Sequence, residues 1–137
     1  PKKSAMKFVV PKYTSRGSLD KKVQDKLLAD GTAREIRVNV NSIDGIIAEM
    51  GLKKPDFVKM DVEGFELEVL NGMKNTLSRG NRKRPELFIE IHDWLGRPII
   101  KFLESRNYSI FHVEANSAIK SRAIPKIFEG HIYCKPE

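Results

Sequence analysis

The chain has 137 residues, a length that suits one folded domain with a single core. Its hydrophobic fraction of 40% and charged fraction of 31% are ordinary for a globular protein and argue against a disordered chain. No apolar run approaches the roughly 20 residues that a membrane-spanning helix requires. We therefore expect no membrane partner.

Cysteine content and charge narrow the class further. The single cysteine, Cys134, excludes an intramolecular disulfide and a zinc site of several thiolates, and it favours a reducing, cytoplasmic location. The net charge of +7 would suit an anionic partner. However, the basic residues are spread along the chain, apart from a run at residues 79–84 that we interpret as a solvated loop. Without an aromatic and basic platform, nucleic acid is not the expected partner.

The N-terminal region predicts a hairpin followed by a helix. Residues 7–10 favour a short strand that is broken by Pro11. Apolar residues at helical spacing predict a helix over about residues 19–29. Residues 37–40 then indicate a brief extended piece. We treat residues 1–40 as the N-terminal part of one partial domain that spans residues 1–137.

From residue 41 onward, strands and helices alternate in the predicted pattern. The predicted elements are helix 42–50, strand 56–61, helix 64–77, strand 86–92, helix 98–106, strand 108–114 and strand 131–135. This order predicts an α/β fold whose parallel strands are joined by right-handed crossovers. The last two strands have no room for a full crossover helix between them, so we expect them to pair antiparallel.

The carboxyl ends of the two central strands are the expected functional site, because ligands of open α/β sheets bind there. Asp61 ends the first of these strands, and His92 ends the second. If the two strands are neighbours in register, Asp61 would lie beside His92, and Lys59 would lie beside Glu90. Each charge in the strands would then have a partner, as buried charges require.

Each candidate residue also has a structural explanation. Glu63, Glu66 and Glu68 lie in the first turns of a helix, where the dipole favours acids, and we adopt this explanation for Glu66 and Glu68. Gly64 either permits a tight turn or lets a ligand approach the backbone. His92 is explained equally well as a structural or a functional histidine. No spacing along the chain indicates a metal site, so none is predicted.

Three segments in the same order resemble the FkbM-type methyltransferases, which use S-adenosylmethionine. Residues 56–72 contain D-V-E-G followed by E-L-E-V-L-N-G, which resembles the hallmark of this family. Residues 40–47 resemble a short upstream helix of the family, and residues 85–92 (P-E-L-F-I-E-I-H) resemble a downstream strand. Ordered matches over about 55 residues are far more specific than a lone glycine motif.

The resemblance implies a Rossmann-like fold. It also implies an enzyme that transfers a methyl group from S-adenosylmethionine to a hydroxyl, often on a sugar or a small metabolite. The residues it implies for the cofactor site are Asp61, Val62, Glu63 and Gly64. His92 would be the base or the group that orients the acceptor, with Asp61 and Glu63 as further catalytic residues. Lys59 and Glu90 would form a supporting layer.

The chain also departs from the family pattern. No glycine-rich strand-to-helix turn precedes residue 40, and no second strand ends in an acid that could hold a ribose. We therefore expect a truncated sheet that lacks the first three strands and the cofactor-binding half. The strand at residues 55–61 would then be an open apolar edge, which predicts a homo-oligomer or a partner chain that supplies the missing strands. The alternative function is a non-catalytic binding or assembly module of the same fold.

Overall fold

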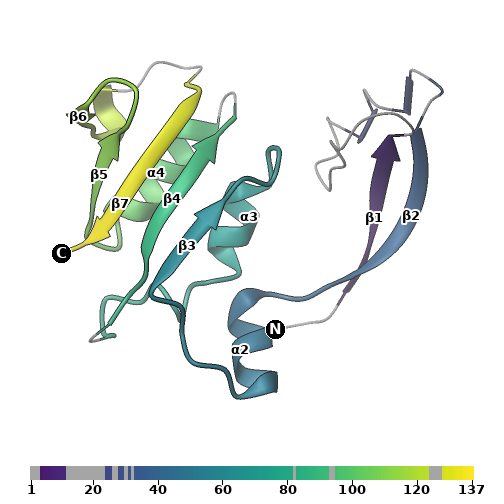
Figure 1. The fold of residues 1–137 in the computed structure, drawn as a ribbon, viewed down its shortest axis with the longest axis horizontal. Coiled ribbons are helices and arrows are strands. Elements are labelled where there is room, and N and C mark those ends of the chain that lie inside the picture. The colour runs from purple at the N-terminus through teal and green to yellow at the C-terminus, as the bar shows by residue number, and fades with distance from the viewer. Residues whose placement is uncertain are drawn as a thin grey trace.

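Two separate β-sheets organise the chain (Figure 1). A computed structural model describes residues 4–11, 24, 25, 28, 29, 31, 33–81, 83–92, 95–123 and 128–137. Strands β1 (Ser4–Pro11) and β2 (Ala33–Val40) form the smaller sheet, in an antiparallel pair. The larger sheet has five strands in the order β3-β4-β7-β5-β6.

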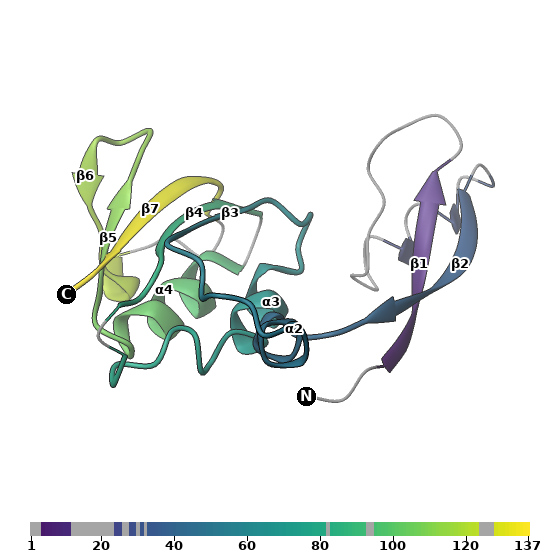
Figure 2. The same cartoon turned by 60° about the horizontal axis from the view of Figure 1, so that its bottom comes forward.

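The β1–β2 pair stands to one side of the larger sheet, and the chain passes from β2 through a helix before it enters that sheet (Figure 2). The strand predicted at residues 7–10 is confirmed as part of β1, and the extended piece at residues 37–40 is the end of β2. Most of the helix predicted over residues 19–29 lies outside the described residues, although residues 24, 25, 28 and 29 are helical.

The first well-defined helix, α2 (Ile43–Met50), confirms the prediction over residues 42–50. Ser42 is its N-cap, and the Ser42 hydroxyl accepts a hydrogen bond from the backbone N–H of Gly45 at 3.0 Å. Gly51 ends the helix in the left-handed conformation with φ 61°, which a glycine adopts without steric cost. Both ends were predictable because capping depends on neighbours in sequence.

Asp44 fixes α2 to the segment that follows helix α3 (Glu66–Asn71). Its carboxylate accepts hydrogen bonds from the backbone N–H of Asn75 at 2.7 Å and from that of Thr76 at 2.9 Å. The Thr76 hydroxyl donates a third bond at 2.7 Å. Charge-assisted bonds of this kind are stronger than neutral ones. They hold α2 against the larger sheet's helical layer.

The larger sheet mixes parallel and antiparallel pairs. Strand β3 (Phe57–Met60) runs parallel to β4 (Glu86–Ile91). Strand β7 (Gly130–Pro136) lies between β4 and β5 (Tyr108–His112) and is antiparallel to both. The two-residue strand β6 (Ser117–Ala118) extends the far edge. The predicted α/β class and the predicted antiparallel pairing of the last two long strands are confirmed.

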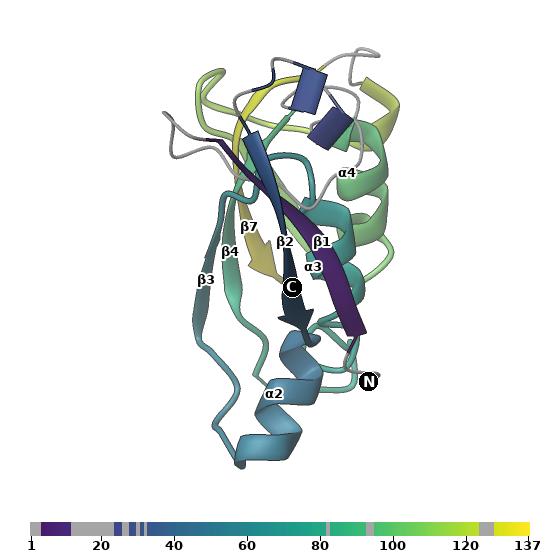
Figure 3. The same cartoon turned by 90° about the vertical axis from the view of Figure 1, so that its right-hand side faces the viewer.

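Helices α3 and α4 (Gly96–Glu104) lie on the same face of this sheet (Figures 2 and 3). The prediction of one helix over residues 64–77 is wrong, because α3 ends at Asn71 and turns follow. Gly72 follows α3 directly, and the glycine lets this turn pack closely against the start of α2, since a Cβ there would lie only 3.2 Å from the Ser42 Cβ. Helix α4 begins two residues before Pro98, and a 3₁₀ turn at Ser121–Ala123 packs beside it.

The core lies between the larger sheet and its helices. Ile89 of β4 is opposite Ile132 of β7 in the strand register, and both side chains are fully buried. The buried Tyr108 hydroxyl donates a hydrogen bond to the Pro85 carbonyl at 2.9 Å, so its polar end is satisfied. None of the helices in the described part of the chain is long and apolar enough to cross a bilayer.

Cys134 is expected to resist thiol reagents in the folded protein. It is fully buried in β7, and this burial raises the pKa of the thiol far above its ordinary value of 9.0. Because the thiolate is the reactive form, Ellman's reagent should label native protein very slowly and label protein in guanidinium quickly. Cys134 is the only cysteine, so the absorbance change reports on it directly. Rapid stoichiometric labelling in native buffer would contradict the packing of β7.

Candidate functional site

The register expected between β3 and β4 is wrong by two residues. Lys59 lies opposite Phe88, and Met60 lies opposite Ile89. A shift of two residues keeps every side chain on the same face of the sheet, so the apolar pattern alone does not detect it. Lys59 therefore does not pair with Glu90. Its amine is exposed and lies 4.0 Å from Asp61 Oδ2.

The turn after β3 is built from two consecutive residues with left-handed backbone angles. Glu63 has φ 50°, and Gly64 has φ 92°. Glycine adopts such angles freely, whereas a glutamate there is uncommon. The Gly64 backbone N–H donates a hydrogen bond to Glu66 Oε1 at 3.1 Å. Gly64 is thus required by the turn itself, and the turn aims its backbone N–H at a buried carboxylate.

Glu66, the first residue of α3, is fully buried. Besides the Gly64 bond, Oε1 lies 3.0 Å from His92 Nδ1. The other oxygen, Oε2, is buried and has no hydrogen-bond partner among the described residues. A buried carboxylate is costly unless polar groups compensate it, so Glu66 is not merely an acid favoured by the helix dipole.

Sequence reasoning therefore missed Glu66, although a signal was present. Glu66 precedes the buried residues Leu70, Met73 and Leu77 at helical spacing, while its neighbour Glu68 is exposed. An acid on the apolar stripe of a helix indicates a specific buried partner. Here that partner is His92.

His92 directly follows β4 and is 28% exposed at its side chain. Its Nε2 lies 3.6 Å from Glu90 Oε1 and 3.8 Å from Glu63 Oε2. When Nδ1 donates its proton to Glu66, Nε2 is left as an acceptor that faces these carboxylates. One ligand atom each from Asp61, Glu90 and His92 lies within 4.8 Å of the others. The structure thus brings Asp61 and His92 together, as expected, but with Glu90 beside them.

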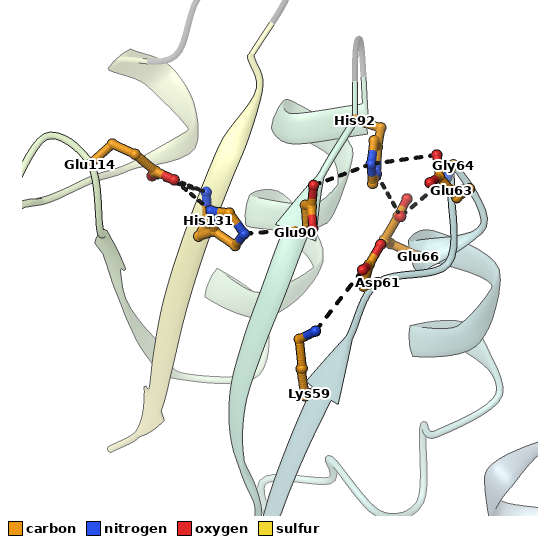
Figure 4. A network of polar contacts seen from close by, with 9 residues as sticks. All are labelled: Lys59, Asp61, Glu63, Gly64, Glu66, Glu90, His92, Glu114 and His131. Atoms are coloured by element: carbon orange, nitrogen blue, oxygen red, sulfur yellow. Dashed lines mark hydrogen bonds and ion pairs between the residues drawn. The ribbon is translucent and has the colours of Figure 1, made fainter. Parts of the chain in front are cut away.

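A second histidine extends this group across the sheet (Figure 4). His131 of β7 lies opposite Glu90 in the register, and its Nε2 is 3.5 Å from Glu90 Oε2. On its other side, His131 Nδ1 lies 2.5 Å from Glu114 Oε1. Carboxylates and imidazoles therefore alternate from Glu114 to Glu66. Sequence reasoning missed His131 and Glu114 because their proximity depends on β7 lying next to β4.

The Glu114–His131 pair predicts a specific pH dependence of stability. Hydrogen bonds from the side chain and the backbone N–H of His131 lower the pKa of Glu114 from 4.5 to about 2. A lowered pKa contributes stability that is present above about pH 4.5 and is lost as the pH falls toward 2. Glu114 is 48% exposed, so solvent screening limits the effect to about 1 kcal/mol or less.

Urea unfolding at pH 7 and at pH 3 measures this contribution. Wild type should lose more stability between the two pH values than Glu114→Gln, which cannot ionise. Equal losses in the two proteins would mean that the pair is not formed in solution.

The site is an open group of side chains and not an enclosed cavity. A hollow of about 190 Å³ lies elsewhere, between α2 and the start of α3, and its lining includes Ser42, Phe65 and Val69. Asp61, Glu66, Glu90 and His92 are not among the residues that line it. The polar side chains and the hollow therefore lie at different places in the fold.

Comparison with known proteins decides the family. The model of the methyltransferase FkbM domain matches residues 5–110. The chain belongs to the FkbM methyltransferase family. The FkbM match covers β1 and β2 as well as the strands that carry Asp61 and His92. It extends well beyond the three segments that the sequence motifs had indicated.

The chain is also similar to the hexuronic acid methyltransferase AglP of Haloferax volcanii. The two are 39% identical over 61 residues, which cover 44% of this chain and 24% of AglP. The matched region therefore covers only about a quarter of the length of AglP. No solved structure matches the chain.

The remaining predicted site residues take different positions. The Val62 side chain packs against the hydrophobic core, so only its backbone is part of the turn, where its carbonyl accepts a bond from the Phe65 N–H at 3.3 Å. Asp61 is exposed at the end of β3. Asp93 and Trp94, which follow His92, lie outside the described residues.

Proposed function

We propose that the chain is part of an S-adenosylmethionine-dependent enzyme that methylates a hydroxyl of a sugar or small metabolite. Membership of the FkbM family supports methyl transfer, and the name of AglP supports a sugar acid as the acceptor class. The observation that carries the proposal is the pairing of His92 Nδ1 with the buried Glu66, which leaves Nε2 facing the strand ends.

The residues at the strand ends fit the positive groups of the cofactor. S-adenosylmethionine carries a sulfonium and an ammonium group, and the carboxylates of Asp61, Glu63 and Glu90 complement positive charge. When bound, the cofactor supplies an electrophilic methyl group. The described residues offer no glycine-rich strand-to-helix turn for the carboxylate end of the cofactor. We propose that another segment provides that part of the site.

In this proposal, His92 accepts the proton of the acceptor hydroxyl at Nε2. Glu66 holds the ring orientation through Nδ1 and stabilises the imidazolium that forms, because its carboxylate is close and buried. The carboxylates of Asp61 and Glu63 complement the positive groups of the cofactor on the same side of the sheet. The protein's contribution is mainly to align the hydroxyl with the methyl group and to exclude water.

Strand β3 offers an edge at which the missing part could join. Among the described strands it pairs with β4 alone, and Phe57 at its start is 54% exposed. Open apolar edges promote pairing with another strand. We propose that a second copy or a separate partner chain occupies this edge. Light scattering should then give a mass above that of the monomer, and a monomer at working concentration would contradict the proposal.

Two measurements test the function. Calorimetric titration with S-adenosylhomocysteine, the product left when the cofactor loses its methyl group, tests whether a polypeptide that contains this chain binds it. Incubation with methyl-labelled S-adenosylmethionine and a panel of hexuronic acids and neutral hexoses asks whether label reaches a hydroxyl. Binding together with labelled sugar is the expected result. Binding of sugar or cofactor product without any transfer would favour a non-catalytic module, and the enzyme proposal would be abandoned.

A further inference from the structure

We propose that Asp61, Glu90 and His92 form a binding site for a divalent cation of the Mn²⁺ class. One oxygen of each carboxylate and one ring nitrogen of His92 lie within 4.8 Å of one another. Adjacent ligands bonded at about 2.1 Å in octahedral geometry lie about 3.0 Å apart, and His92 Nε2 is 3.6 Å from Glu90 Oε1, so only a small approach is needed. A mixed set of carboxylates and one imidazole suits a cation that accepts both oxygen and nitrogen.

The orientation of His92 is the first feature that favours a ligand. Metal-bound histidines usually donate their other ring N–H to a carboxylate, which fixes the tautomer and aims the free nitrogen at the ion. Glu66 Oε1 lies 3.0 Å from Nδ1, so Nε2 is the nitrogen left for an ion, and it lies 3.6 Å from Glu90 Oε1. Glu66 is fully buried, so it holds the ring from inside the protein.

Glu66 also supplies an independent sign of an absent positive group. Its Oε2 is buried without a hydrogen-bond partner in the described part of the chain. Figure 4 shows the Glu66 carboxylate lying between Asp61 and His92, where it points into the group of proposed ligands. An orphaned carboxylate oxygen in this position is expensive unless positive charge lies close by. A divalent cation held by Asp61, Glu90 and His92 provides that charge.

The second ligand, Glu90, has an outer partner of its own. Its Oε2 lies 3.5 Å from His131 Nε2, while Oε1 faces His92. The two oxygens are therefore divided between one protein partner and the proposed ion. His92 and Glu90 are only partly buried and Asp61 is exposed, so an ion can enter from solvent.

The cation site stands on this geometry and does not depend on methyl transfer. If the proposed methyltransferase activity holds, an ion here would lie where the acceptor hydroxyl binds and would lower the pKa of that hydroxyl. The ion would then occupy His92 Nε2 and the carboxylates of Asp61 and Glu90. The roles proposed above for these three residues therefore belong to the ion-free protein. Removal of the ion with EDTA distinguishes the ion-bound and ion-free roles.

Titration of the whole chain with Mn²⁺, followed by the loss of the free Mn²⁺ signal in electron paramagnetic resonance, tests the site. Wild type should bind one ion, and Asp61→Asn and His92→Gln should abolish binding. Glu66→Gln should weaken affinity by about 10- to 100-fold, as expected for an outer partner of a ligand. His112→Gln is the matched control, because His112 on β5 is not one of the proposed ligands and its Nε2 lies 3.1 Å from Glu114, at the far end of the polar group. Far-UV circular dichroism of each variant confirms that it is folded.

The proposal is overturned if wild type binds no Mn²⁺ at millimolar concentration, or if Asp61→Asn binds as tightly as wild type. Asp61 is exposed, so its replacement does not threaten folding. Failure of the methyltransferase proposal has a different signature. In that case Mn²⁺ still binds to the folded chain and its binding still depends on Asp61, whereas no label reaches the sugar with or without EDTA.

Discussion

Replacement of His92 by glutamine is expected to lower the rate of methyl transfer by about 10²- to 10⁴-fold, the usual contribution of a positioned base. Glutamine can still form a hydrogen bond to Glu66, but it cannot take up the proton of the acceptor hydroxyl at neutral pH. The loss should appear in kcat, because the imidazole gains charge only as the hydroxyl is deprotonated. Transfer of label from S-adenosylmethionine to the sugar measures the rate.

Matched histidine and acid variants separate chemistry from folding. His112→Gln replaces a partly buried histidine on β5 and should retain nearly full activity. Glu66→Gln keeps the shape of the positioning side chain but removes its charge, so kcat should fall less than in His92→Gln. If His92→Gln and His112→Gln have equal rates, His92 has a structural role and the proposed base lies elsewhere.

The elements that the sequence predicts well depend on local chemistry. Helix α2 is capped by Ser42 and Gly51, and each cap forms with atoms only a few residues away. The antiparallel pairing of β5 and β7 was predictable because the segment between them has no room for a full crossover helix. The two strand ends that carry Asp61 and His92 were predictable from the rule that ligands bind at the carboxyl edge.

The parts that sequence reasoning got wrong depend on pairing between distant segments. A two-residue shift of β3 against β4 leaves the buried faces unchanged, so nothing in the apolar pattern placed Asp61 next to Glu90. The insertion of β7 beside β4 brings His131 to Glu90, and only strand order determines that contact. The site is therefore a product of topology, whereas its individual residue types are visible in the sequence.

Ile89 lies at the centre of the same topology, and its replacement by alanine is expected to have the largest effect on stability. The side chain is fully buried and lies opposite Ile132, where β4 meets β7. Truncation of such a residue costs about 2–5 kcal/mol through lost burial and the cavity that remains. That is a large part of the roughly 5–15 kcal/mol that stabilises a typical domain.

Urea unfolding followed by circular dichroism measures the loss as a lower midpoint at an unchanged slope. Val113→Ala is the matched control, since Val113 is exposed beyond the end of β5 and should change stability by about 0.5 kcal/mol or less. The double variant Ile89→Ala/Ile132→Ala should lose less than the sum of the two single losses, because both side chains border one cavity. Equal midpoints for Ile89→Ala and Val113→Ala would mean that β4 and β7 are not adjacent. The contact between Glu90 and His131 would then be lost as well, because the same strand pairing creates both.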